Sequence, residues 1–332
     1  MNEIVELSLP ENIADKACHS IFDLSDEQVK ALGQFFDLQE RSLAPNTLRG
    51  LKTDLGFFLE FCRDNGLVAL PCSLDTIKAF IKHRADSDVK GATISRNLSA
   101  ISKLHDAINA PNACRSAIVR DELRAVKRAR PQRKKQATPI RFSALWEWDK
   151  YIRESDALAD IRDRAMMWCF YDCLLRGDEL HRAEVSWVEY LDDGDAIFHI
   201  PTHKGDQEGE GSEAYLSPHT VSALKRWLES ASITTGRLFR SFTVEGEIRS
   251  SISANGIRRI ISNRGFEMGI LGASNHSFRV GATQDLVEAG ESSARIQLAG
   301  RWKSDRMVGE YSRNQRAKTG AMAELSKRQG RS

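Results

Sequence analysis

The stretch HSFRVGATQDLVEAGESSARIQLAGRWKSDRMVGEYSRN, residues 276–314, decides the fold of the second half of this chain. Its apolar spacing, broken by glycine and serine, predicts short helices at 280–289, 292–298 and 307–312. His276 and Arg279 lie three residues apart at the mouth of the first helix. Trp302 and Tyr311 follow, nine residues apart, and Tyr311 lies among arginines. The tyrosine is therefore either an amphipathic surface residue or a reactive one.

Two clusters upstream supply further groups suited to a phosphate. In LLRGDEL, Arg176 and Glu179 lie three residues apart, on one face of a helix. In THKG, Lys204 ends a predicted strand. Arginine presents a fixed fork of donors and keeps its charge, so Arg176 and Arg279 could neutralise a pentavalent phosphorus transition state. Trp302 can only donate, which suits a non-bridging oxygen.

Proton transfer requires the remaining groups. Tyr311 could supply the nucleophilic oxygen, but a phenol with a pKa of about 10 is protonated at neutral pH. His276 could take the proton, and cations near Tyr311 would favour the phenolate. Lys204 could protonate a departing sugar oxygen. Acidic residues in the loop after Lys204 would repel a phosphate, and these are Asp206, Glu208, Glu210 and Glu213.

Each cluster also has an ordinary structural interpretation. An isolated RxxE is usually a salt bridge within a helix, and an isolated HxxR is mostly structural. A tryptophan near the end of a chain is more often core than catalyst. Only the order and spacing of all the clusters favour chemistry.

Alternating residues between 185 and 217 predict a three-stranded antiparallel meander, with turns at DDGD and GDQEGEGS. Two helices are expected between Phe142 and Cys173. Further helices are expected at 219–231, 254–268 and 317–328.

The first half predicts a bundle of short helices, because apolar residues recur at helical spacing from Leu48 to Leu104. Asn46, Ser73 and Thr93 are the predicted helix caps. From Arg124 to Lys135, seven of twelve residues are basic and Pro131 interrupts any helix. We place the domain boundary there. The segment is either a solvated tether or a strap across phosphates.

Composition narrows the class of protein. The 332 residues are 41% hydrophobic and 28% charged, with a formal net charge of +2. Residues 1–40 hold nine acids and two lysines, a balance of −7, so the remainder carries +9, which is compatible with a polyanionic ligand. The sequence has no run of 18 apolar residues and no secretory signal, so we expect a soluble, unexported protein. Cys169 and Cys173 have no neighbouring ligands to complete a metal site, so no metal is expected.

The ordered set resembles the signature of the tyrosine recombinases, the phage-type integrase family, and in particular its Cre-like members. It consists of Arg176, Lys204, His276, Arg279, Trp302 and Tyr311. The stretches APNTLRGLKTDLGFFLEFC and ATISRNLSAISKLHDAIN look like helices of the family's core-binding domain. Two departures are Gly177–Asp178, where small apolar or hydroxyl residues are usual, and Arg301, which replaces a frequent glycine.

This resemblance implies a mainly α fold, with an N-terminal helical, SAM-like core-binding domain and a mostly helical catalytic domain that contains the small sheet. The expected parts are an acidic leader (1–24), the core-binding domain (25–126), a basic linker (127–140) and the catalytic domain (141–332).

The implied activity is site-specific DNA recombination through a 3′-phosphotyrosine at Tyr311, without cofactor or metal. Arg176, Arg279, His276 and Trp302 would hold the phosphate. Lys204 would act as general acid, and Glu179 would support the pocket. The implied assembly is a tetramer on two inverted-repeat DNA sites, in which residues 320–328 pass a helix to a neighbour. The implied setting is the cytoplasm and nucleoid of a prokaryote, phage or mobile element.

The expected DNA contacts come from three segments. Arg49 and Arg96 could reach base edges, and Asn255, Arg258 and Arg259 lie on a candidate major-groove helix. Phosphate contacts are expected from Thr47, Thr93, Ser95, Arg133, Lys134 and Lys135. The alternatives are an integrase or dimer resolvase that needs accessory factors, a type IB topoisomerase, and a DNA-binding protein with a decayed active site.

Overall fold

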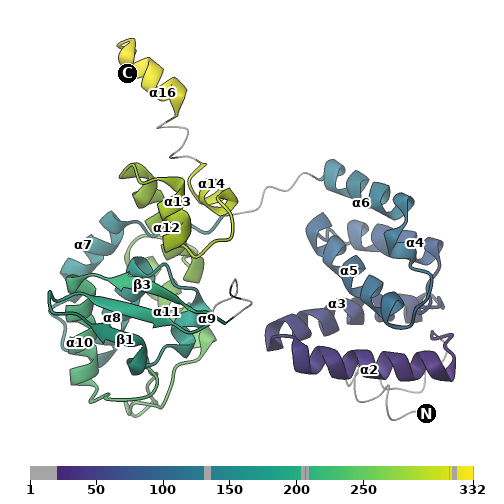
Figure 1. Cartoon of the computed structure of the whole chain (residues 1–332), viewed down its shortest axis with the longest axis horizontal. Helices are drawn as coiled ribbons and strands as arrows, with labels where there is room; N and C mark the ends of the chain where they lie inside the picture. The colour runs from purple at the N-terminus through teal and green to yellow at the C-terminus, as the bar shows by residue number, and fades with distance from the viewer. Residues whose placement is uncertain are drawn as a thin grey trace. The chain divides into compact units, whose positions relative to one another are not determined.

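Two compact units, residues 1–134 and 135–332, make up the chain in the computed structural model (Figure 1). The structure describes residues 21–130, 136–202, 206, 209–313, 315 and 320–331. Lys204 and most of the predicted acidic leader lie outside the described residues, as do the linker residues Arg133, Lys134 and Lys135. Within the described part, no helix combines the length and apolar character needed to cross a membrane.

The described part of the first unit consists of helices and the segments that connect them. Its elements are α2 (Asp26–Ser42), α3 (Pro45–Asp64), α4 (Leu74–Asp86), α5 (Gly91–Ala107), the 3₁₀ turn η3 (Ala113–Arg115) and α6 (Ala117–Ala129). The apolar stripes predicted from the sequence form its core. Phe58 of α3 and Phe80 of α4 are fully buried, with ring centroids 5.1 Å apart in an edge-on contact.

Helix starts are only partly as predicted. Ser73 caps α4, where its side chain accepts a hydrogen bond from the Thr76 amide. The predictions for Asn46 and Thr93 are wrong, because α3 begins at Pro45 and α5 at Gly91, so both residues lie inside their helices. Proline is pre-shaped for a first helical position, which explains the earlier start of α3.

Helix α6 extends into the segment that we assigned to the linker. It continues to Ala129, so residues 127–129 are helical. The basic side chains Lys127 and Arg128 lie in its last turn, where cations interact favourably with the helix dipole. Part of the predicted linker is therefore the end of a helix.

The second unit combines helices with one small sheet (Figure 1). Its helices are α7 (Phe142–Ile152), α8 (Leu158–Asp172), α9 (Gly177–Arg182), η4 (Val185–Trp187), α10 (Pro218–Ser230), α11 (Ala254–Glu267), α12 (Asn275–Glu288), α13 (Ser293–Ala299), α14 (Arg306–Tyr311) and α16 (Ala321–Arg328). Its strands are β1 (Val188–Tyr190), β2 (Ala196–Ile200) and β3 (Ser212–Leu216), paired antiparallel in the order β1-β2-β3. The mainly helical fold and the predicted meander are confirmed.

Helices α8 and α12 form the centre of this unit. Phe170 of α8 stacks on Phe278 of α12, with ring centroids 5.3 Å apart and ring planes 10° apart. Both rings are fully buried. Because Phe278 precedes Arg279, this contact fixes the helix turn from which that arginine projects.

Residues 136–141, most of which belong to the predicted linker, lie along α12, and we call them the anchor segment. The Ile140 amide donates to the Ser277 carbonyl at 3.0 Å. A Cβ atom on Gly281 would lie 1.7 Å from the Ile140 carbonyl oxygen, so only glycine permits this approach. At the end of the segment, Arg141 pairs with Asp285 at 2.5 Å.

Candidate active site

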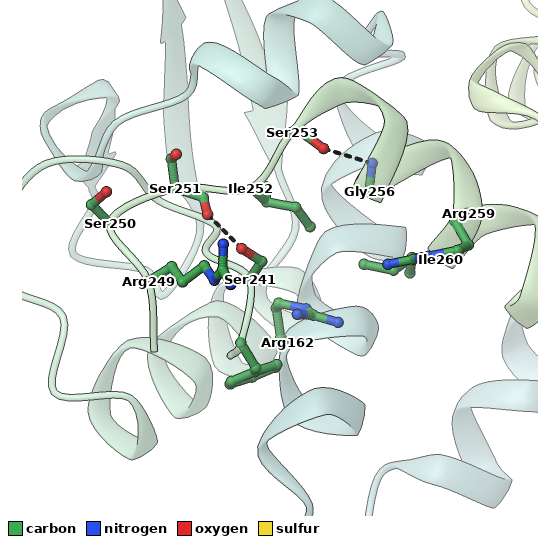
Figure 2. Close-up of a pocket in the computed structure, with 11 residues that line it drawn as sticks. Arg162, Ser241, Arg249, Ser250, Ser251, Ile252, Ser253, Gly256, Arg259 and Ile260 are labelled. Atoms are coloured by element: carbon green, nitrogen blue, oxygen red, sulfur yellow. Dashed lines mark hydrogen bonds between the residues drawn. The ribbon is translucent and has the colours of Figure 1, made fainter. Parts of the chain in front are cut away.

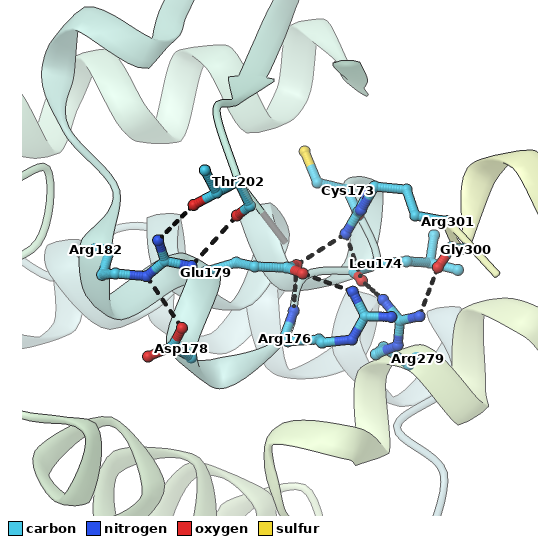
Figure 3. Close-up of polar contacts among 10 residues, drawn as sticks. All are labelled: Cys173, Leu174, Arg176, Asp178, Glu179, Arg182, Thr202, Arg279, Gly300 and Arg301. Carbon is cyan, nitrogen blue, oxygen red and sulfur yellow. Dashed lines mark hydrogen bonds and ion pairs between the residues drawn. The ribbon is translucent and has the colours of Figure 1, made fainter. Parts of the chain in front are cut away.

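A short turn between α8 and α9 forms the floor of the site (Figure 3). Leu174 has a left-handed backbone, with φ of 45°. Arg176 follows as the N-cap residue of α9. The Cys173 and Leu174 carbonyl groups of this turn are hydrogen-bond acceptors. Arg279 and Arg301 donate to them, and Arg176 donates to Glu179.

Glu179 ties Arg176 to this turn. Its carboxylate accepts from the Arg176 amide at 2.8 Å and from Arg176 Nη1 at 2.7 Å. Glu179 is only 1% exposed. Burial would raise its pKa, but the charges of Arg301 and Arg176 and the Arg176 amide hold the pKa below its usual value. The predicted pairing of Arg176 with Glu179 is thus present in the structure.

Gly177 explains one departure from the family pattern. A Cβ atom at this position would lie 1.7 Å from Nδ2 of Asn275, the first residue of α12. The start of α9 and the start of α12 therefore approach closely at a glycine. The structure thus gives this glycine a packing role.

Arg279 is a fully buried cation. It donates to the Leu174 carbonyl and, through Nη2, to the Gly300 carbonyl at 2.6 Å. Burial and the charges of Arg176 and Arg301 lower the pKa of Arg279 to about 9. One carboxylate, Glu179, faces three guanidinium groups in this cluster. The site thus has a surplus of positive charge that an anion would relieve.

Trp302 and Tyr311 complete the cluster. Their ring centroids are 5.5 Å apart with ring planes at 69°, and the Arg279 guanidinium lies 5.0 Å from the Trp302 ring centroid. A Cβ atom on Gly300 would lie 2.4 Å from the Trp302 ring, so glycine is required before the turn. The four side chains Arg176, Arg279, Trp302 and Tyr311 therefore belong to one site.

Burial changes the expected chemistry of Tyr311. It raises the pKa of the phenol above its usual value, and the charges of Arg279 and Arg176 only partly oppose the shift. The nearby cations favour the phenolate, as we expected, but burial outweighs their effect. The phenol needs a proton acceptor, or the arrival of a substrate, before it reacts.

The other predicted groups are His276, Lys204 and the acidic residues of the loop after Lys204. His276 is the second residue of α12, one turn before Arg279, and its side chain is exposed. Lys204 lies outside the described residues. Asp206 accepts from the Gly209 and Gly211 amides at 2.8 and 2.9 Å, so its carboxylate is engaged by the loop backbone.

Two glutamine side chains, neither of which the sequence patterns identified, form hydrogen bonds with the backbone of Tyr311. Gln136 Nε2 and Gln284 Nε2 both donate to the Tyr311 carbonyl oxygen, at 3.0 and 3.1 Å. This oxygen is an acceptor left open at the end of α14. Gln136 belongs to the anchor segment, and no spacing pattern links it to a residue 175 positions later.

The residues predicted to contact DNA differ in their exposure and in their hydrogen bonds within the protein. Thr47, Asn255, Arg258 and Arg259 are exposed on their helices, whereas Thr93 and Ser95 are only partly exposed. Arg49 is also exposed and donates to Asn46 at 2.6 Å.

Arg96 already holds a structural partner. Its Nε and Nη2 atoms bind the buried Asp54 carboxylate at 2.6 and 2.8 Å. The Nε and Nη2 atoms of Arg96 are therefore occupied within the unit, while its side chain is 62% exposed, and the predicted base contact stays a prediction.

A separate open pocket of about 640 Å³ lies at the start of α11 (Figure 2). Arg249 and Arg259 line it together with Ser241, Ser250, Ser251 and Ser253. Arg162 also lines it but is paired with Asp163 at 2.7 Å. The pocket shares no residue with the arginine and tyrosine cluster, and it adds a basic surface to the predicted major-groove helix.

Comparison with known families defines the class. Residues 147–318 match the Phage integrase family, and residues 33–110 match the phage integrase N-terminal SAM-like domain. The relatives include Cre and Xer tyrosine recombinases, so this is an enzyme of the tyrosine recombinase class. The chain belongs to the phage integrase family.

Similar proteins cover nearly the whole chain. The integrase/recombinase xerD homolog of Selenomonas ruminantium is 29% identical over 287 residues, covering 82% of each chain. Recombinase cre of Escherichia phage P1 is 25% identical over 320 residues, covering 91% of this chain and 93% of the relative.

Among solved structures, XerH recombinase bound to a palindromic difH substrate aligns with a TM-score of 0.63 and 12% identity, over 96% of this chain and 93% of XerH. A Tn1549 transposon integrase aligns with a TM-score of 0.58 and 11% identity, over 85% of this chain and 93% of that chain. These similarities show the shared fold.

Proposed function

We propose that this chain recombines DNA at a specific site by forming a 3′-phosphotyrosine at Tyr311. The observation that supports this most is the cluster of Arg176, Arg279 and Arg301 around the buried carboxylate of Glu179, with Tyr311 beside it. A phosphodiester bound there would supply the missing negative charge next to the nucleophilic oxygen.

Strand cleavage follows from these positions. The Tyr311 oxygen attacks phosphorus, an O–P bond forms, and the bond from phosphorus to the 5′-oxygen breaks. Arg176 and Arg279 bind the non-bridging oxygens, and Trp302 donates its indole N–H to the same group. Rejoining is the reverse attack by a 5′-hydroxyl, so bond energy is conserved.

Two protons must move during cleavage. The raised pKa of Tyr311 means that its proton has to be accepted, and His276, one turn before Arg279, is the proposed acceptor. Lys204 is the proposed donor to the departing 5′-oxygen.

The proposed substrate is double-stranded DNA with inverted repeats, bound by four copies of the chain in a Cre-like assembly. XerH in its complex has a palindromic substrate. Helix α16 (Ala321–Arg328) is the proposed link between copies, and its Met322 and Leu325 side chains are exposed apolar groups. Arg49, Asn255, Arg258 and Arg259 are the proposed groove contacts.

Two alternatives make different predictions. A recombinase that depends on accessory factors would cleave DNA alone but exchange strands only with added proteins. A DNA-binding protein with a decayed site would bind without cleaving. The buried, fully engaged contacts of Arg279 and Glu179 favour a site that still functions.

The test is a covalent trapping experiment with full-length protein. The probe is a nicked duplex containing the site selected by the protein from a random-sequence pool. The nick lets the short 5′-hydroxyl strand diffuse away, so the adduct accumulates. We expect Tyr311→Phe to bind this duplex like the wild type and to form no adduct.

Tyr151→Phe is the matched control, because Tyr151 is 85% exposed and outside the cluster. It should form the adduct at the wild-type rate. Adduct formation by Tyr311→Phe at that rate would exclude Tyr311 as the nucleophile.

A further inference from the structure

We propose that Arg301 is a positioning residue of this active site, which holds the turn between Leu174 and Glu179 so that Arg176 and Arg279 meet the phosphate. This inference rests on the proposed function. In this proposal Arg301 acts through the turn and not on the substrate: its side chain is 4% exposed, and its terminal nitrogens contact Cys173, Leu174 and Glu179.

The contacts of Arg301 all lead to one turn (Figure 3). Nη1 donates to the Cys173 carbonyl at 2.8 Å, and Nη2 donates to the Leu174 carbonyl at 3.1 Å. Nη2 also pairs with Glu179 Oε2 at 3.0 Å. A single guanidinium therefore connects the end of α8 with the first turn of α9.

Arg301 shares a partner with each of the two arginines proposed to bind the phosphate. The Leu174 carbonyl accepts from Arg279 as well as from Arg301. The Glu179 carboxylate accepts from Arg176 as well as from Arg301. A shift of the turn would therefore displace both arginines together, and small displacements of positioning groups have large effects on rate.

Stability alone does not explain this residue. Arg301 has a left-handed backbone, with φ of 52°, which glycine adopts more readily. Its charge is buried, and its Nε atom is buried without a hydrogen-bond partner among the described residues. Unfavourable features that accumulate at one residue are typical of functional sites.

The charge of Arg301 also keeps Glu179 ionised. The charged or titratable groups facing Glu179 are Arg176, Arg279, Arg301 and Cys173. Without Arg301 the pKa of this buried carboxyl would rise, and a protonated Glu179 would hold Arg176 less well. Because protonation occurs as pH falls, the loss of cleavage at acid pH should then begin at a higher pH.

The test uses three full-length variants and the nicked duplex described above. Arg301→Gly removes the side chain and suits the left-handed backbone. Arg301→Met removes the charge but keeps the length, and Arg301→Lys keeps the charge without the fork. Arg295→Met is the control, because Arg295 pairs with Glu291 on the surface of the same unit.

We expect Arg301→Gly and Arg301→Met to bind the duplex like the wild type and to slow single-turnover cleavage by up to about 100-fold. In both variants, the acid limb of the pH–rate profile, where cleavage is lost as pH falls, should move to higher pH. Arg301→Lys should restore the acid limb but not the full rate, and Arg295→Met should match the wild type in both respects.

A wild-type rate and acid limb in Arg301→Gly would overturn the proposal. If that variant does not fold, as judged by circular dichroism, a wild-type rate in Arg301→Lys would overturn it equally. An adduct in Tyr311→Phe would instead overturn the proposed function, so the two failures are distinguishable.

Discussion

Arg279 combines full burial with two cationic neighbours, and this makes its charge unusually dependent on what binds beside it. Burial and the charges of Arg176 and Arg301 lower its pKa to about 9. An anion in the site would favour the protonated guanidinium. Binding of the anion and protonation of Arg279 must therefore reinforce each other.

Sulfate tests this coupling, since its own charge is constant between pH 7 and pH 10. Its affinity should be higher at pH 7 than at pH 10, because the anion binds best beside the protonated guanidinium. The measurement is calorimetric titration of Tyr311→Phe, which removes the phenol's own ionisation. Subtracting the heat measured with the double variant Tyr311→Phe, Arg279→Met removes the contribution of sulfate bound elsewhere. Equal affinities at pH 7 and pH 10 would contradict the coupling.

At the scale of the element, α14 is held where it ends. The carbonyl group of Tyr311, its last residue, accepts from Gln136 and from Gln284. Gln284 is nearly buried on α12, whereas Gln136 is exposed. Because either amide alone can satisfy the oxygen, their contributions should not be independent.

Leucine substitutions test this arrangement. Gln136→Leu and Gln284→Leu should each slow adduct formation by less than about fivefold, because one donor remains. The double variant leaves the carbonyl unpaired, at a cost of about 1–3 kcal/mol, and should lose more than the product of the single effects. Adduct rate and duplex affinity are measured together. Gln34→Leu, an exposed glutamine on α2, is the control, and strictly multiplicative losses would refute the shared role.

How far sequence predicts these elements depends on the range of the contacts. Periodicity and turn residues located the helices and the meander, because those patterns are local. The caps at Asn46 and Thr93 failed since Pro45 and Gly91 start their helices earlier. The contact of Gln136 with Tyr311 could not be predicted, because it spans 175 positions.

The site shows the same limit. The spacing of Arg176 and Glu179 alone predicted their pairing. The order of Arg279, Trp302 and Tyr311 along the chain predicted that they belong to one site. Arg301 appeared only as a departure from a glycine, because its role depends on a left-handed backbone and on carbonyl groups of a distant turn. The sign of the Tyr311 pKa shift depends on burial, which the sequence does not display.

At the scale of the whole molecule, the two units differ in their optical properties. All six tryptophans and all five tyrosines lie after residue 135, in the second unit. Tryptophan fluorescence therefore reports the second unit alone, whereas far-ultraviolet circular dichroism reports the helices of both. Unfolding of the first unit should appear in dichroism without a change in fluorescence.

This difference tests the structural role of Arg96. Arg96→Met leaves the buried Asp54 carboxylate with Asn97 as its remaining donor, at 2.8 Å. We expect a loss of about 1–2 kcal/mol in the first unit, toward the lower end because Arg96 is largely exposed. In urea, the dichroism transition should move and the fluorescence transition should not. Arg49→Met should change stability by less than about 0.5 kcal/mol, and equal effects of the two variants would refute the structural role.

The anchor segment has a mechanical consequence. It is hydrogen-bonded to Ser277, pressed against Gly281 and ion-paired with Asp285, all on α12, and its first residue holds the backbone of Tyr311. A pulling force on the chain before residue 136 would thus load α14 and α12 before any other element of the second unit. In an optical-trap experiment, the first rupture should detach Gln136 from α14, so tension alone would uncouple Tyr311 from its support.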